Sequence, residues 1–122
     1  MTEKIYLAGP MTGYPHFNFP AFHSFAAKLR AEGHEVFSPA ERDIERVKEQ
    51  GKDWVECPTG THEEAKANGF GIREALSDDT KYICNTATMI AMMPGWENSA
   101  GANAEWTLAK ALKLKFRYLT NA

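Results

Sequence analysis

The pattern of apolar and polar positions divides the chain into short strands that alternate with helices. Apolar runs at residues 4–8 and 88–93 are typical of strands buried in a parallel sheet, and a glycine–proline or proline–glycine pair follows each of them. Two further runs, at residues 35–37 and 115–119, also predict strands. We therefore expect a sheet built from segments that lie far apart in the chain.

Between these strands, apolar residues recur at the spacing of an amphipathic helix. Phe22, Phe25, Ala26 and Leu29 follow the i, i+3, i+4, i+7 pattern. A second helix is predicted from Ile72, with Leu76 and Ile83 as further apolar anchors, and a third over residues 102–112.

Three segments are less regular. Residues 11–20 contain glycine, prolines and asparagine and predict a loop. Residues 41–51 predict a short charged helix, and residues 52–70 show little periodicity. An irregular insertion of that length in a small domain is usually functional or mobile, and in this chain it could cover a site or contact a partner subunit.

Strands that alternate with helices imply a parallel sheet covered on both faces. The predicted fold is α/β, a flavodoxin/Rossmann-like three-layer sandwich with a parallel sheet of four to five strands, in one domain spanning residues 1–122. Ligands of such sheets bind outside the carboxyl ends of the strands. This rule selects three segments for a site: Gly9–Pro20, Ser38–Glu41 and Pro94–Gly101.

Composition limits the classes of function. The 122 residues are 43% hydrophobic and 25% charged, as expected of a folded globular domain. A net charge of -2 argues against a protein that coats nucleic acid or a membrane surface, because both need a basic field. No apolar run approaches a membrane span, and the short apolar stretch near Met1 does not resemble a signal peptide. Cys57 and Cys84 form no C-x-x-C pair, so we expect a reduced, cytoplasmic protein.

The segment from Pro94 to Leu112 has the most informative chemistry. Small residues between Ser99 and Ala102 allow a ligand close to the backbone, and the free N–H groups of a helix N-terminus favour an anion such as phosphate. Glu105 lies about one turn into this helix and is positioned to face the cleft. It can equally be an ordinary acid placed against the helix dipole.

Other candidates have similar alternatives. The hydroxyl of Tyr6 can reach the cleft, or Tyr6 can be a core residue with its hydroxyl at the rim. Gly9 permits close ligand contact or simply makes a turn. Phe17 and Phe19 can stack on a nucleobase, although packing in the core is the simpler interpretation. Asp79 and its neighbour Asp78 point in different directions on a helix, so at most one of the two serves a site.

Several kinds of site are not supported by the sequence. The histidines and cysteines lack metal-ligand spacing, so we expect neither a structural metal nor a cofactor. The glycine-rich phosphate loops of common nucleotide-binding folds and the G-x-S-x-G elbow of serine hydrolases are absent.

Two separated motifs, IYLAGPM and PGWENSAGANAEWTLAKAL, together resemble the nucleoside 2-deoxyribosyltransferase-like superfamily, in particular its short phage- and prophage-associated members. Asn18–Phe22 and Arg73–Asp79 extend the resemblance to nearly the whole chain. The chain is also similar to deoxynucleoside-monophosphate N-glycosidases. The resemblance implies cleavage of an N-glycosidic bond, or transfer of a deoxyribosyl group, on a small nucleotide or nucleoside in a homodimer or higher assembly.

The resemblance also implies roles for individual residues. Glu105 matches the nucleophile that attacks the anomeric carbon, Asp79 matches the second carboxylate, and Tyr6 joins them as a catalytic candidate. A covalent glycosyl ester on a carboxylate splits a difficult displacement into two easier steps. The implied substrate-binding residues are Gly9, Pro10, Met11, Asn18, Phe19, Trp96, Ser99 and Gly101.

Two positions refine these expectations. Relatives that act on free nucleosides carry an aspartate six residues before the nucleophile, whereas the monophosphate N-glycosidases carry a serine. This chain has Ser99, which implies a 5′-monophosphate substrate. Relatives often have an aspartate where this chain has Thr88, so base recognition or protonation is expected to differ.

Fold does not fix function, so two alternatives stay open. The same pocket can bind a nucleotide or an ADP-ribose-like ligand without turning it over, or the resemblance can be purely structural. The sequence distinguishes neither purine from pyrimidine nor hydrolysis from transfer.

Overall fold

A four-stranded parallel sheet lies at the centre of the computed structural model, with the strand order β2-β1-β3-β4. The strands are β1 (Lys4–Ala8), β2 (Glu35–Phe37), β3 (Met89–Met92) and β4 (Lys115–Tyr118). The structure describes residues 2–54, 57–61, 63 and 71–121, so much of the irregular segment predicted at 52–70, including His62, lies outside the described residues. The predicted α/β class and parallel sheet are confirmed.

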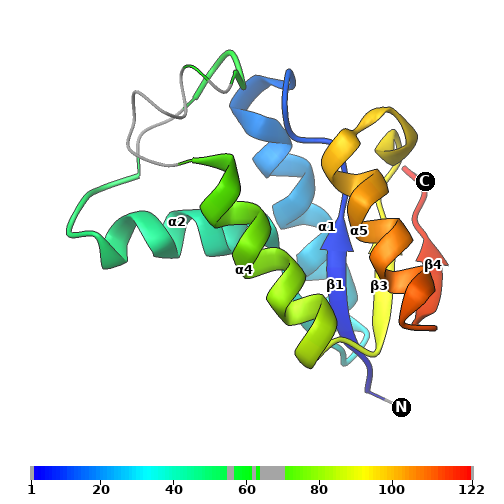
Figure 1. Cartoon of the computed structure of the whole chain (residues 1–122). Coiled ribbons are helices and arrows are strands. Elements are labelled where there is room, and N and C mark those ends of the chain that lie inside the picture. The colour runs from blue at the N-terminus through cyan, green and yellow to red at the C-terminus, as the bar shows by residue number, and fades with distance from the viewer. Residues whose placement is uncertain (1, 55–56, 62, 64–70, 122) are drawn as a thin grey trace.

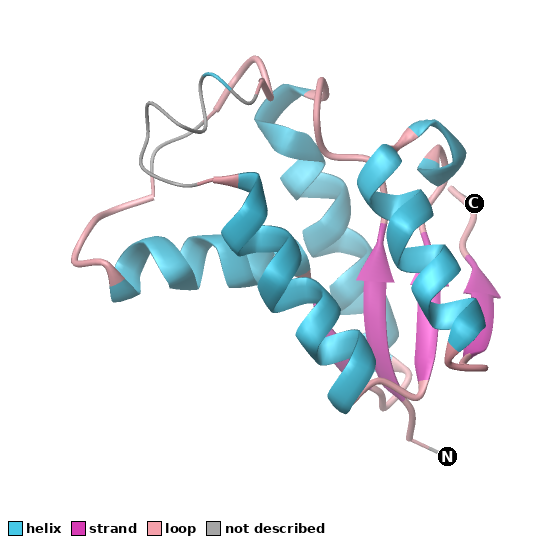
Figure 2. Ribbon diagram, in the orientation of Figure 1, coloured by secondary structure: helices cyan, strands magenta, loops and turns pink. Residues whose placement is uncertain are grey.

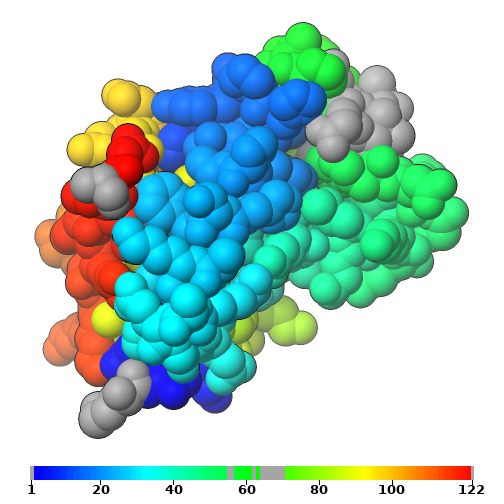
Figure 3. Space-filling view, turned by 180° about the vertical axis from the view of Figure 1, so that it is seen from behind, coloured from blue at the N-terminus to red at the C-terminus, as the bar shows by residue number. Residues whose placement is uncertain are grey.

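Helices cover both faces of the sheet, which gives three layers (Figure 1). The helix α1 (Phe19–Ala31) covers one face, and α4 (Ile72–Asn85) and α5 (Ala100–Ala111) cover the other. The helix α2 (Pro39–Glu49) packs against both α1 and α4. In the view from behind, α1 lies between β4 and α2 (Figure 3). Two short 3-10 helices complete the described elements: η1 (Pro15–Asn18) and η2 (Trp96–Asn98).

The alternation of side chains along β1 separates the two halves of the core. Ile5 and Leu7 belong to the cluster under α1, whereas Tyr6 and Ala8 belong to the cluster under α4 and α5. All four are fully buried. β1 is a central strand of the sheet, and in Figure 2 its carboxyl end lies between the ribbons of α4 and α5.

The structure corrects two predictions, the start of the first helix and the burial of two apolar side chains in α4. The helix α1 begins at Phe19, inside the segment expected to be a loop, because Pro20 is tolerated in the first turn of a helix. Ile72 and Leu76 were expected to anchor α4 in the core, but their exposed fractions are 53% and 36%. Ile83 is the anchor that does pack in the core, with an exposed fraction of 1%.

None of the helices among the described residues is long and apolar enough to cross a membrane.

Candidate active site

A cleft opens at the carboxyl end of β1, between α5, α4 and the start of α2. Its cavity volume is about 100 Å³. Four ionisable side chains line it: Tyr6, Asp43, Asp79 and Glu105. The remaining lining residues are small or apolar apart from two hydroxyl side chains: Gly9, Met11, Thr12, Pro39, Ile72, Ala75, Leu76, Ser99, Gly101 and Ala102.

A hydrogen bond between Tyr6 and Glu105 lies at the centre of the cleft. The Tyr6 hydroxyl donates to Oε2 of Glu105 over 2.7 Å. Tyr6 is fully buried, and the exposed fraction of Glu105 is 6%. Glu105 is therefore not a solvated acid at the helix start, and Tyr6 both packs in the core and reaches the cleft.

Of the two adjacent acids in α4, only Asp79 faces this cleft. Its exposed fraction is 6%, and its Oδ1 atom is buried without a hydrogen-bond partner among the described residues. Asp78 points instead toward the arginines of α2. The two acids thus point in different directions, as expected of neighbours on a helix, and Asp79 is the one that lines the cleft.

Asp43 is a third cleft acid, which the sequence analysis missed. It lies on α2 with an exposed fraction of 3%, and its Oδ1 accepts a hydrogen bond of 2.9 Å from Nη1 of Arg46. The signal was present in the sequence, because Ala40, Asp43 and Val47 follow the i, i+3, i+7 spacing of a buried helix face. The face was not recognised because most residues around it in 41–51 are charged.

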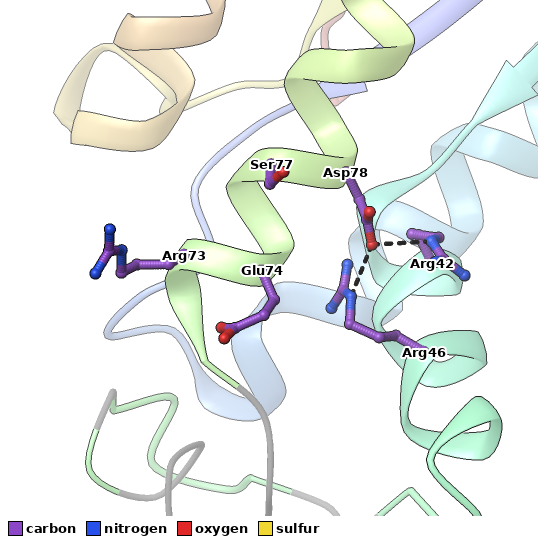
Figure 4. A pocket seen from close by; sticks show the side chains of 6 residues that line it. All are labelled: Arg42, Arg46, Arg73, Glu74, Ser77 and Asp78. Atoms are coloured by element: carbon purple, nitrogen blue, oxygen red, sulfur yellow. Dashed lines mark hydrogen bonds and ion pairs between the residues drawn. The ribbon is translucent and has the colours of Figure 1, made fainter.

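Two arginines join α2 to α4 beside the cleft (Figure 4). Nε of Arg42 and Nε of Arg46 both donate to Oδ2 of Asp78, at 3.1 and 2.7 Å. Arg73 points away from this cluster. A surface pocket with a cavity volume of about 430 Å³ lies over these side chains.

Burial raises the pKa of all three cleft acids. It raises the pKa of Glu105 to about 8, although the hydrogen bond from Tyr6 lowers it and the Asp43 charge raises it further. Burial, followed by the charges of Glu105 and Asp43, raises the pKa of Asp79 to about 9. Burial also raises the pKa of Asp43, to about 6, against the hydrogen bond from Arg46.

These pKa values set an order of ionisation. Asp43 loses its proton before the other two acids, and the charge of Glu105 then opposes ionisation of Asp79. Ionisation of Glu105 therefore favours the state in which Asp79 keeps a proton to donate. Two acids whose pKa values are separated in this way are suited to nucleophilic and acid roles.

Small residues shape the rest of the cleft. A Cβ atom on Gly9 would lie 2.8 Å from Cβ of Met93, so packing inside the protein already requires glycine there. Ser99 is the N-cap of α5, and its Oγ accepts from the N–H of Ala102 at 3.2 Å. The Ser99 hydroxyl proton remains free to donate to a ligand beside Gly101.

Four other residues expected to bind substrate do not line the cleft. Asn18 donates through Nδ2 to the carbonyl of Pro10, at 3.0 Å, so both belong to the loop that supports the cleft. Phe19 is buried and stacks on Trp54. Trp96 stacks on Trp106, with ring centroids 5.7 Å apart.

Thr88 lies at the opposite end of the sheet from the cleft. Its hydroxyl accepts from the N–H of Lys4 and donates to Oε1 of Glu3, at 2.9 and 2.8 Å. A residue at this position cannot contact a ligand outside the carboxyl ends of the strands. The expected effect of Thr88 on base recognition is therefore not supported by its position.

No group of three or more histidine, cysteine, aspartate or glutamate side chains within the described ranges has the geometry of a metal site. The family described as "Domain of unknown function (DUF4406)" matches residues 3–118. The chain belongs to the DUF4406 family. Searches of curated proteins and of solved structures returned no match. The cleft of this DUF4406 chain therefore has to be interpreted from its own chemistry.

Proposed function

We propose that this DUF4406 chain cleaves the N-glycosidic bond of a nucleoside 5′-monophosphate, by hydrolysis or by transfer of the sugar. The observation that carries the proposal is the buried Tyr6–Glu105 hydrogen bond in a cleft that is also lined by the buried acid Asp79. The resemblance to the nucleoside 2-deoxyribosyltransferase-like superfamily supports the same assignment.

In the proposed first step, a carboxylate oxygen of Glu105 attacks the anomeric carbon of the sugar. The bond from that carbon to the base nitrogen breaks, and the bonding electrons leave with the base. Asp79 donates its proton to the departing nitrogen. The product is a glycosyl ester on Glu105, formed through an oxocarbenium-like transition state. Tyr6 holds the Glu105 carboxylate in position through its hydroxyl.

In the second step, water or another base attacks the same carbon. The Asp79 carboxylate takes the proton of the nucleophile, and the ester oxygen returns to Glu105 as a carboxylate. This restores both side chains to their starting states.

The size of the cleft supports the binding of the sugar, the base and the phosphate in three different regions. A volume of about 100 Å³ is smaller than a typical small-molecule site of roughly 300–1,000 Å³, so it suits the sugar ring alone. The exposed side chains of Ile72 and Leu76 at the lining offer an apolar surface for the base. Ser99 and the first N–H groups of α5 suit the 5′-phosphate. A second copy of the chain would enlarge this partial cleft, and light scattering tests for a homodimer.

The direct test is a panel of deoxynucleoside monophosphates and free deoxynucleosides, with base release followed by chromatography. We expect release from the monophosphates and little from the nucleosides. Ser99→Asp is the matched variant, because aspartate also caps a helix but repels a phosphate dianion. It should reverse the preference. Equal turnover of both substrate classes by the unmodified protein contradicts a monophosphate specificity.

A non-catalytic nucleotide-binding protein is the second candidate. It is favoured by the raised pKa of Glu105, which leaves much of this nucleophile protonated at neutral pH. Thermal stabilisation by a nucleotide without base release, at any pH up to about 9, would support binding alone.

A further inference from the structure

Arg46 contacts two carboxylates, one on its own helix α2 and one on α4. Its Nη1 donates to Oδ1 of Asp43 over 2.9 Å, and its Nε donates to Oδ2 of Asp78 over 2.7 Å. Asp43 lines the cleft, whereas Asp78 lies outside it and directly precedes the cleft acid Asp79. One guanidinium thus connects a cleft acid on α2 to the helix that carries another.

Burial makes this connection unlike an ordinary surface ion pair. The exposed fraction of Arg46 is 6%, and that of Asp43 is 3%. Nη2 of Arg46 is buried without a hydrogen-bond partner in the part of the chain that the structure describes. A buried guanidinium with an unsatisfied amino group is not expected to stabilise the fold by much. This favours a role of Arg46 in positioning Asp43 and Asp78.

Arg42 provides an internal comparison. It also lies on α2 and also donates to Oδ2 of Asp78, at 3.1 Å, with further ion pairs to Glu45 and Glu49. Unlike Arg46, it makes no hydrogen bond to Asp43 among the described contacts. Both arginines therefore link α2 to Asp78 of α4 (Figure 4), and they differ in that Arg46 also contacts the cleft acid Asp43.

We propose that Arg46 is a positioning residue of the cleft, which fixes the Asp43 carboxylate at the cleft wall and ties it to α4. The effect on turnover rests on the proposed function, whereas the effect on Asp43 does not.

The groups around Asp43 define what removal of Arg46 changes. Arg46 and Arg42 favour the charged form of Asp43, whereas burial and the charge of Asp78 oppose it. The Asp43 charge in turn acts on Asp79, Glu105 and Tyr6. Without Arg46, the buried Asp43 carboxyl keeps its proton to higher pH and no longer presents a fixed anionic acceptor to the cleft.

The experiment compares Arg46→Met with Arg42→Met. Carboxyl carbon NMR follows the titration of Asp43, assigned with Asp43→Asn. We expect Arg46→Met to raise the pKa of Asp43 by about 1–3 pH units and Arg42→Met to raise it by much less. On the nucleotide panel, Arg46→Met should lower kcat/KM by about 10- to 100-fold and move the pH profile, whereas Arg42→Met should do neither.

Arg46→Lys keeps the experiment decisive if Arg46→Met does not fold. Lysine carries the charge but cannot bridge two carboxylates as a planar guanidinium does, so an intermediate pKa of Asp43 is expected. An Asp43 titration that is the same in the unmodified protein and the folded Arg46 variants overturns the proposal, and so does an equal loss of turnover in both methionine variants. If the unmodified protein releases no base from any nucleotide, the proposed function fails, and the Asp43 titration still decides the role of Arg46.

Discussion

The two faces of the sheet use the same strand in opposite ways. Toward α1, β1 presents Ile5 and Leu7, which pack with Phe22 and Leu29 in an apolar core. Toward α4 and α5 it presents Tyr6, whose hydroxyl meets the buried Glu105. Burial of apolar surface stabilises the fold, whereas burial of carboxyl groups opposes it. The first face therefore stabilises the fold, whereas the buried acids of the second face lower its stability, as expected of a site kept for the proposed function.

Substitution of Glu105 should have the largest effect. It should also separate the contribution of this buried acid to turnover from its cost to stability. Glu105→Gln keeps an acceptor for Tyr6 but removes the nucleophile, so turnover should fall by about 10³-fold or more. Because the folded pKa is raised, the native protein binds more protons than the unfolded chain from about pH 4.5 upward, and stability falls as pH rises toward about 8. Glu105→Gln should therefore raise the free energy of unfolding at pH 8 by on the order of 1–3 kcal/mol. Base release and urea unfolding at that pH measure the two effects, and unchanged turnover would remove Glu105 from the mechanism.

A substitution in the apolar core under α1 should lower stability and leave turnover unchanged. Leu29 is fully buried under the sheet, so Leu29→Ala should lower the free energy of unfolding by about 2–5 kcal/mol through the cavity that it leaves. Turnover per folded molecule should stay unchanged. Urea unfolding with activity normalised to the folded fraction tests this, and a loss of normalised activity would mean that the faces are not independent.

The pH dependence of turnover should follow the acids of the second face. The rate should rise as Glu105 ionises near pH 8 and fall as Asp79 loses its proton near pH 9. A bell-shaped profile with a mildly alkaline maximum is expected from initial rates across pH 5–11. Asp43→Asn serves as the control, because removal of its charge should move the acidic limb to lower pH. An acidic maximum would contradict the assigned roles.

The smallest effect is expected at the amino end of the sheet. Thr88→Val removes an exposed hydrogen bond to Glu3 and should change the free energy of unfolding by no more than about 1 kcal/mol. Turnover should not change, because Thr88 lies at the far end of β3. A changed preference among bases in the nucleotide panel would show that this end of the sheet communicates with the cleft.

The fold was predictable because its strands and helices have clear periods. Short apolar runs closed by glycine and proline marked β1 and β3, and the rule for parallel sheets then selected the correct edge for a cleft. Tyr6, Ser99 and Glu105 line the cleft at this edge. Each could be predicted there from its position relative to the end of a strand.

The remaining differences have physical causes. Phe19 and Trp96 have side chains suited to stacking on a base, but neither lines the cleft. Phe19 stacks on Trp54 and Trp96 on Trp106, and no local pattern distinguishes these two uses. Asp43 was missed because a charged helix usually faces solvent, and its burial depends on the packing of α2 against α1 and α4. Ile72 and Leu76 follow helical spacing but lie at the cleft, because the core ends before the first turns of α4.

The hydrogen bond between Tyr6 and Glu105 joins residues 99 positions apart. During synthesis the amino-terminal residues emerge first, so β1 is made long before its β3 neighbour and before α5. Contacts between such distant segments make folding slow, because a long loop has to close before they form. The cleft therefore cannot form in a nascent chain that lacks α5, and the three acids become buried together only when β1, α2, α4 and α5 have assembled.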